Sequence, residues 1–166
     1  RGSKKKITIV EKGKAVEKRR CPKAVLKRCV NCTPSCDITT GFSGAGAFSD
    51  GKLSLSCEVG GELPSLLGED AAQALIDYTD TIYLDFGADS HVEGLVVTDE
   101  VKDIRRRAIG AGLKLVLCPI RHLGTEKAQE LYLSIENHLI EHGVELLMET
   151  ECTNLIIENE ACLGAV

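Results

Sequence analysis

Apolar and polar residues alternate along this chain with two different periods, and each change of period predicts a change of secondary structure. Short β-branched or alternating apolar runs predict strands at residues 7–10, 52–57, 113–118, 144–148, 152–157 and 161–166. Apolar residues spaced three or four positions apart predict helices over residues 70–86, 98–110 and 125–142. The polar stretch 14–20 is also expected to begin a helix. Alternating strands and helices with a β-rich C-terminal end predict an α/β or α+β fold with two packed layers.

Three residues mark where these helices are expected to begin or end. Thr98 precedes the second helix and is a candidate N-cap, because its hydroxyl can accept a hydrogen bond from a free N–H of the first turn. Gly87 and Gly143 follow the first and third helices, and glycine commonly ends a helix. The helix boundaries are therefore expected close to these residues.

Composition excludes several classes of protein. The chain has 166 residues, of which 43% are hydrophobic, so it can bury a core and is too apolar for a disordered chain. No apolar run is long enough to span a membrane. No signal peptide is visible, because the basic N-terminus contains only a short apolar run. Without a signal peptide, the eight cysteines favour reduced thiols or a metal site over disulfides. We therefore expect a cytoplasmic protein with no membrane partner.

Charge is distributed unevenly along the sequence. Residues 1–36 contain 12 Lys and Arg against two Glu, a balance of +10, whereas the remainder contains 8 against 23 acids, a balance of −15. A basic segment of this kind is either an anion-binding or nucleic-acid-binding patch or a solvated helix face. No aromatic residues are interleaved with the basic ones for base stacking. The solvated face is the favoured interpretation, and a nucleic-acid partner is not expected.

Half of the cysteines cluster within this basic segment. The spacing Cys-x7-Cys-x2-Cys-x3-Cys is formed by Cys21, Cys29, Cys32 and Cys36. A Cys-x2-Cys pair is the usual turn in which two thiolates share one ion, and four thiolates suit tetrahedral zinc or an iron–sulfur cluster. The alternative is four reduced thiols in a loop, with a redox pair among them. The other cysteines stand alone among apolar residues and are expected to be buried as small hydrophobic side chains.

A glycine-rich stretch at residues 41–52 is the main candidate for a ligand-binding loop. Its small side chains let backbone N–H groups approach a ligand closely, which suits phosphate oxygens. Ser43 and Ser49 would add hydroxyl donors, and Lys52 would add a counter-charge. The alternative is a flexible linker, although linkers rarely contain two phenylalanines and an Asp-Gly-Lys ending. The glycine spacing is Gly-x-x-Gly-x-Gly, which is not the dinucleotide fingerprint.

Acidic and basic residues at the ends of two predicted strands are further candidates. Glu11 ends the first strand, where dinucleotide-binding folds hold the ribose hydroxyls of an adenosine. Arg121 and His122 lie in the expected loop between a strand and a helix, where ligand-binding side chains often occur. Arg121 lies near the positive end of a predicted helix, which favours an anion site. The alternative for His122, considered alone, is a surface or structural residue.

Five segments that contain these candidates together resemble one family. They are residues 8–13, 41–53, 82–87, 118–126 and 143–157. In this order they are similar to the FAD-dependent dehydrogenases of the uncharacterised, glutathione-reductase-like flavoprotein group, which are NAD(P)/FAD-dependent oxidoreductases. The phrases Gly-Ala-Gly-Ala-Phe-Ser-Asp-Gly-Lys and Arg-His-Leu-Gly-Thr are specific to that group. A variant of the group also carries a cysteine-rich insert at the position of residues 21–36.

The resemblance implies a partial FAD-binding fold of the glutathione-reductase type, with helices packed on a mixed sheet. Glu11 matches the acid that binds the adenosine ribose, and Cys152 matches the position whose backbone meets the adenine. Arg121 and His122 match the substrate-side loop, where His122 is the candidate acid–base group because imidazole titrates near neutral pH. The loop that lies against the flavin and pyrophosphate matches residues Gly44, Ala45, Gly46, Ser49, Asp50, Gly51 and Lys52.

The resemblance also implies that the chain is an internal piece of a longer enzyme. The strand and Gly-x-Gly-x-x-Gly turn with which such flavoproteins begin do not precede Glu11. Residues 1–60 would then be part of the FAD-binding region, residues 61–142 a substrate-side segment, and residues 143–166 a return to the FAD-binding region.

Two functions from different classes follow. The first is an FAD-dependent oxidoreductase that acts on a small-molecule substrate, with NAD(P)H as a possible electron donor. The alternative is an interaction module in which the clustered cysteines hold zinc or an iron–sulfur cluster and the basic segment meets an anionic partner.

Overall fold

The computed structural model describes residues 4–166, apart from the side chain of Thr125, and these residues form two compact units. Unit 1 combines the chain up to Ser49 with Ala128–Val166, and unit 2 consists of Asp50–Lys127. Both helices and strands are present, so the expected α/β or α+β class is confirmed. Within residues 4–166, no helix has the length and apolar character needed to cross a membrane.

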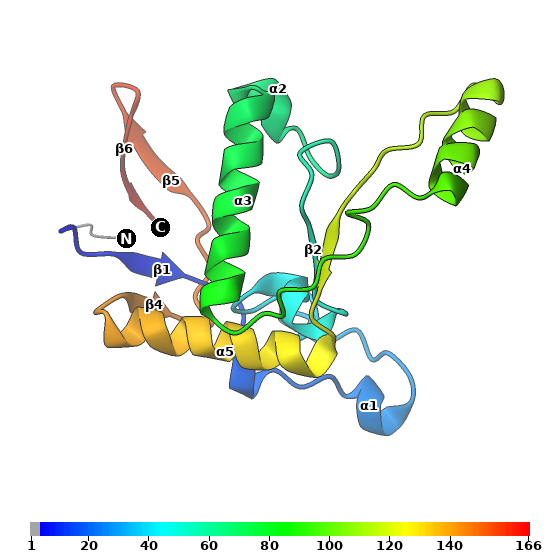
Figure 1. Ribbon diagram of the computed structural model, residues 1–166. Coiled ribbons are helices and arrows are strands. Elements are labelled where there is room, and N and C mark those ends of the chain that lie inside the picture. The colour runs from blue at the N-terminus through cyan, green and yellow to red at the C-terminus, as the bar shows by residue number, and fades with distance from the viewer. Residues whose placement is uncertain (1–3) are drawn as a thin grey trace. The chain divides into compact units, whose positions relative to one another are not determined.

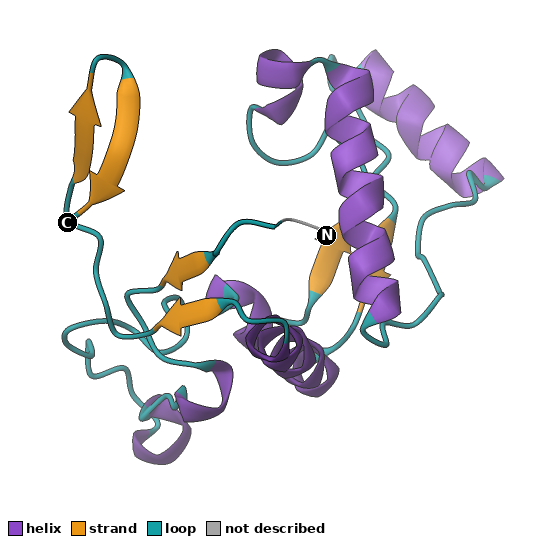
Figure 2. Cartoon of the chain, turned by 90° about the vertical axis from the view of Figure 1, so that its left-hand side faces the viewer, coloured by secondary structure: helices purple, strands orange, loops and turns teal. Residues whose placement is uncertain are grey.

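Unit 1 contains two separate pairs of strands. Strand β1 (Thr8–Val10) pairs in parallel with β4 (Glu145–Leu147), and Thr8 lies opposite Glu145 (Figure 1). Strands β5 (Leu155–Glu158) and β6 (Ala161–Ala165) form an antiparallel hairpin (Figure 2). The helical elements of this unit are the 3-10 turn η1 (Val16–Lys18), the one-turn helix α1 (Lys23–Leu26), the 3-10 turn η2 (Gly44–Phe48) and most of α5 (Thr125–Glu141).

The core of unit 1 joins η1 to α5. Val16, Ala47 and Leu131 are buried there, and the backbone N–H of Val16 donates to the Glu136 carboxylate at 3.1 Å. Glu136 is only 4% exposed, and this burial raises the pKa of its carboxyl group. The hydrogen bond gives the buried carboxyl group a partner and fixes η1 against the helix.

Unit 2 consists of three helices and one antiparallel strand pair. Strand β2 (Lys52–Ser54) pairs with β3 (Ile120–His122), and Lys52 lies opposite His122. The helices are α2 (Leu63–Leu67), α3 (Glu69–Asp85) and α4 (Asp99–Gly110). Ala72, Arg121 and Leu123 are buried. The charged side chain of Arg121 therefore makes up a large part of the buried core of unit 2.

The long helices lie where the apolar period predicts them. Helices α3, α4 and α5 each agree with the predicted range to within a few residues. Thr98 caps α4 as expected, because its hydroxyl accepts a hydrogen bond from Val101 N–H at 3.4 Å. The short helices α1 and α2 were not predicted, because a single turn is too short to show a period.

Two local predictions are wrong. Residues 113–118 pair with no strand within the described chain, and β3 forms just after them, in residues expected to be a loop. The apolar residues of 113–118 have exposed or half-exposed side chains. A strand also requires a neighbouring strand to pair with its backbone N–H and C=O groups, and the apolar pattern does not supply one. The polar stretch 14–20 forms only the 3-10 turn η1, and Arg19 after it is extended.

Candidate functional site

Glu11 follows β1 directly and is held in a tight turn. Its backbone N–H donates to Leu147 O at 2.9 Å, which extends the pairing with β4 by one residue. Its Oε1 accepts the N–H of Gly13 at 2.7 Å, and no partner is recorded within residues 4–166 for its Oε2. The half-buried carboxylate thus lies at the carboxyl end of a parallel strand, with one oxygen available to a ligand.

Three segments that are distant in the sequence meet at this turn. The N–H of Thr150 donates to Glu11 O at 3.0 Å, and the N–H of Glu149 donates to Gly13 O at 2.8 Å. A Cβ added to Gly13 would lie 2.4 Å from the backbone nitrogen of Gly41, so the glycine loop contacts the turn directly. The parallel pairing of β1 with β4 therefore brings together residues 11–14, the start of the glycine loop and residues 149–150.

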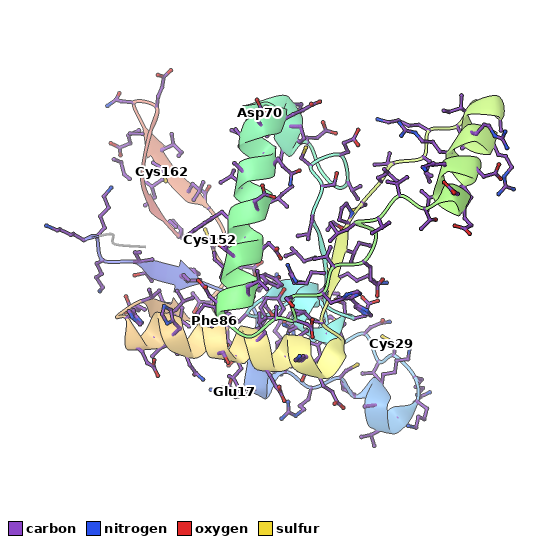
Figure 3. All side chains as sticks on the ribbon, in the orientation of Figure 1. Glu17, Cys29, Asp70, Phe86, Cys152 and Cys162 are labelled. Atoms are coloured by element: carbon purple, nitrogen blue, oxygen red, sulfur yellow. The ribbon has the colours of Figure 1, made fainter. Side chains whose placement is uncertain are left out.

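Cys152 lies just beyond this junction, between β4 and β5 (Figure 3). Its side chain and that of Cys162 are exposed, so the expectation that both are buried is wrong. Cys57 and Cys118, which carried the same expectation, are half-buried. The role expected of Cys152 concerns its backbone, and exposure of the thiol leaves that role open.

The glycine loop contains one buried polar atom without a partner. Ser43 Oγ is inaccessible to solvent and, within the described residues, makes no hydrogen bond. Next to it, a Cβ added to Gly44 would meet no atom within 4 Å, and Ala45 is exposed. An unpaired buried hydroxyl is costly, by about 1–3 kcal/mol, unless a ligand or water satisfies it. The Ser43 hydroxyl is therefore a buried donor without a partner, and the neighbouring Gly44 leaves room beside the loop.

The rest of the loop contacts its own unit. A Cβ on Gly46 would lie 2.7 Å from the hydroxyl oxygen of Tyr132, so a larger residue there would require the Tyr132 side chain to shift. The Ser49 hydroxyl donates to Gly46 O at 3.3 Å, which gives this hydroxyl a structural partner. Of the two serines expected as donors to a ligand, Ser43 has the geometry that fits.

Arg19 holds the glycine loop from within the protein. Its side chain is fully buried and donates to three backbone carbonyls, those of Asp37 at 2.8 Å, Ile38 at 2.9 Å and Phe42 at 2.8 Å. The guanidinium also lies 4.4 Å from the centre of the Phe48 ring. Burial lowers the pKa of Arg19. The interpretation of this segment as a solvated basic face is therefore wrong for Arg19.

The neighbouring basic residues line a cavity of about 450 Å³ beside the Glu11 turn. The cations around it are Lys12, Lys14, Lys18 and Arg20, against the acids Asp37 and Glu149. Lys14 pairs with Asp37 at 3.0 Å. Although burial opposes ionisation of Asp37, the N–H of Arg20 and the ammonium of Lys14 hold its pKa below the ordinary value. The cavity has an excess of positive charge, which suits an anionic ligand.

Unit 2 brings together the end of the glycine loop and His122. Pairing of β2 with β3 places Asp50 Oδ2 4.0 Å from His122 Nε2 and 2.8 Å from the ammonium of Lys52. The hydrogen bond from Lys52 lowers the pKa of Asp50. Asp50 O accepts the N–H of Gly124 at 2.9 Å, and Gly51 O accepts the N–H of Leu123. These backbone bonds fix an exposed Asp–Lys–His cluster.

Arg121 does not join that cluster. It is 3% exposed, and its guanidinium donates to Asp80 through two bonds of 2.5 and 2.7 Å. Its third nitrogen donates to the backbone oxygens of Asp89 and His91. The hydrogen bond with Asp80 raises the pKa of Arg121. All three guanidinium nitrogens are engaged within the protein, which favours a structural role for Arg121 over contact with a substrate.

The four clustered cysteines surround one space in unit 1. Cys21, Cys29, Cys32 and Cys36 all line a cavity of about 310 Å³ next to α1. No three His, Cys, Asp or Glu side chains within residues 4–166 converge closely enough to hold a single ion. The Cys29 thiol is 3.6 Å from Asn31 Oδ1. Backbone N–H groups of Ile38 and Thr39 lower the pKa of the Cys36 thiol. Figure 3 shows Cys29 in the loop after α1.

No protein-family model matches this chain, and no curated protein matches it.

Assignment of the site therefore depends on the geometry of the chain itself. The structure brings Glu11 together with the glycine loop and the segment before Cys152, and it brings Asp50 and Lys52 together with His122. Sequence reasoning missed Arg19 and Asp80. Nothing in the local pattern separates Arg19 from Arg20, or the half-buried Asp80 from the exposed acids of the same helix. Arg19 and Asp80 differ from their sequence neighbours only in the tertiary contacts that they make.

Proposed function

We propose that this chain belongs to an FAD-dependent oxidoreductase that dehydrogenates a small molecule, and that unit 1 holds the adenosine diphosphate part of the cofactor. The carrying observation is the junction of the Glu11 turn, the glycine loop and residues 149–150 at the carboxyl end of a parallel strand pair. Nucleotides bind at the carboxyl ends of parallel strands in α/β folds.

Glu11 suits the ribose. Its Oε1 already accepts one backbone N–H, which orients the carboxylate and leaves Oε2 to accept from the ribose hydroxyls. The backbone of residues 149–152 lies beside the same turn and offers hydrogen-bonding groups to the adenine. This arrangement joins residues that lie more than a hundred positions apart in the sequence, and it supports the proposal.

Two features suit the pyrophosphate. Within the described residues, Ser43 has a buried hydroxyl without a partner, and the next residue, Gly44, has open space around it. The cations Lys12, Lys14, Lys18 and Arg20 give the neighbouring cavity an excess of positive charge. Both features favour an anionic ligand, and a buried donor that awaits an acceptor fits bound phosphate oxygens.

The bound flavin would supply the hydride-accepting chemistry, and the protein would supply the acid–base group. His122 is the proposed base that removes a proton from the substrate hydroxyl or amine during dehydrogenation. Asp50 stabilises the protonated imidazole, because its carboxylate lies 4.0 Å from His122 Nε2.

Replacing Glu11 with Gln tests the cofactor site. The amide can still accept the Gly13 N–H, so the turn remains, but charge-assisted bonds to the ribose are lost. Such bonds contribute about 1.5–3 kcal/mol, so we expect affinity for ADP and FAD to fall by about tenfold or more. Isothermal titration with ADP and fluorescence titration with FAD measure this.

The matched control is Glu158→Gln, which removes an exposed carboxylate from the end of β5. It should leave both affinities unchanged. Equal affinities of the two variants, or no saturable binding of ADP by the unaltered chain, would contradict the proposal.

Replacing His122 with Asn tests the acid–base role. Loss of a positioned base typically slows a reaction by about 10²–10⁴-fold. We therefore expect anaerobic flavin reduction by an alcohol or amine substrate, followed at the visible flavin band, to slow by at least about 100-fold. The control His91→Asn changes an exposed imidazole of the same unit and should have no effect. An unchanged rate in His122→Asn would rule out this role.

A further inference from the structure

The segment of residues 21–36 folds so that all of its cysteines face one space. Cys21 precedes the one-turn helix α1, which ends in the left-handed residue Lys27 (φ 57°), and Cys29 follows. Asn31 is also left-handed (φ 48°) and turns the chain between Cys29 and Cys32. These two reversals return the chain toward Cys21, and the four cysteines line the cavity of about 310 Å³. No carboxylate lines this cavity.

The surroundings suit a negatively charged centre. Lysines and arginines occupy six positions between residues 18 and 28, and no Asp or Glu occurs between residues 18 and 36. Lys23 lines the cavity itself. Four thiolates bound to a metal centre leave a net negative charge, and nearby cations stabilise thiolates. The basic character of the segment therefore has a local explanation that requires no nucleic acid.

The size of the space distinguishes between kinds of centre. A single zinc ion needs its sulfurs about 2.3 Å from one point, whereas these thiols surround a volume without converging on a point. In a [4Fe–4S] cluster each thiolate binds a different iron, so the ligands stand farther apart around a body of several atoms. Four cysteines around a space without carboxylates fit a cluster better than one ion.

We propose that Cys21, Cys29, Cys32 and Cys36 ligate one iron–sulfur cluster. The thiols lose their protons on ligation, and each sulfur binds one iron of the cluster. Asn31 lies beside Cys29 and can rotate its amide so that N–H faces the ligating sulfur, which is a bond of the kind that tunes cluster potential. This site is independent of the proposed flavin site.

The test is anaerobic purification of the whole chain without added flavin, followed by reconstitution with ferrous iron and sulfide. We expect about four irons and four sulfides per chain, a broad brown absorbance, and bleaching of that absorbance by dithionite. Binding of zinc with no iron would overturn the proposal, and so would a chain that holds no metal after reconstitution. Because flavin is absent, failure here is distinguishable from failure of the flavin site.

Single Cys→Ser replacements at the four positions should each remove most of the iron. The control Cys57→Ser, at a half-buried cysteine of unit 2, should retain it. Alkylation of the unaltered chain gives a second measurement that does not depend on how the variants fold. In the reconstituted chain the four ligands should be protected, whereas the exposed Cys152 and Cys162 should react. Equal alkylation of all of these cysteines would overturn the assignment.

Discussion

Replacing Arg121 with Met should lower the free energy of unfolding by about 3 kcal/mol. The substitution leaves the Asp80 carboxylate, which is 16% exposed, without the two guanidinium bonds that it now accepts. It also leaves the Asp89 and His91 carbonyls without their shared donor. Breaking a buried ion pair usually costs about 3–5 kcal/mol of stability. Because Asp80 is partly exposed, we expect a loss at the lower end of that range. Urea denaturation measures the loss.

The double variant Arg121→Met with Asp80→Leu separates pairing from packing. It removes both charges, so its stability should be higher than that of Arg121→Met alone. The control Arg107→Met breaks an exposed pair with Asp103 on α4 and should cost less than about 1 kcal/mol. If Arg121→Met cost no more than this control, Arg121 would not be a structural residue, and its expected role toward substrate would be restored.

The helices were predictable because their signal is local. Seventeen residues of α3 and 17 of α5 repeat the apolar period several times, and Thr98 carries its capping signal in one side chain. The strands of the β1–β4 and β2–β3 pairs were less predictable, since both pairs are short and each strand depends on a partner far away in the sequence, whereas β5 and β6 form a local hairpin. Residues 113–118 have the stronger strand pattern, yet the strand forms at Ile120–His122, where β2 supplies the pairing groups.

The candidate site divides in the same way. Glu11 and the glycine loop could be named from the sequence because a carboxylate after a strand and a run of glycines have local meanings, whereas Cys152 was named only through the resemblance to a flavoprotein family. Their meeting at one turn could not, because it follows from the pairing of β1 with β4 across more than a hundred residues. The four cysteines were evident from spacing alone, but the space that they enclose was not.

Arg19 shows why charge patterns mislead. It lies in a run with Lys18 and Arg20 and has the same appearance as a solvated basic face. The structure buries it completely because three loop carbonyls need donors, and a planar guanidinium can satisfy all three at once. Its two neighbours remain exposed. A run of like charges can therefore contain one residue with a specific internal role.

Arg19→Met should be as damaging as the loss of Arg121, and its effect should concentrate in the glycine loop. Methionine fills part of the space but donates nothing, so the carbonyls of Asp37, Ile38 and Phe42 lose their partners. Unsatisfied buried groups cost about 1–3 kcal/mol each, so we expect a loss of at least about 3 kcal/mol. The contact with the Phe48 ring is also lost. Urea denaturation measures the stability, and hydrogen exchange over residues 37–49 locates the change.

Arg20→Met is the matched control, because it removes a neighbouring exposed guanidinium that, within residues 4–166, donates from its side chain to Arg19 O. Its stability should change by less than about 0.5 kcal/mol, as expected for a surface substitution. Arg19→Lys should resemble Arg19→Met, since one ammonium cannot reproduce the fork that reaches three carbonyls. If Arg19→Lys were fully stable, charge alone would suffice there. The expected result for Arg19→Met is faster hydrogen exchange at residues 37–49 together with weaker ADP binding. That result would show that the buried arginine preorganises the loop that contains Ser43 for binding a ligand.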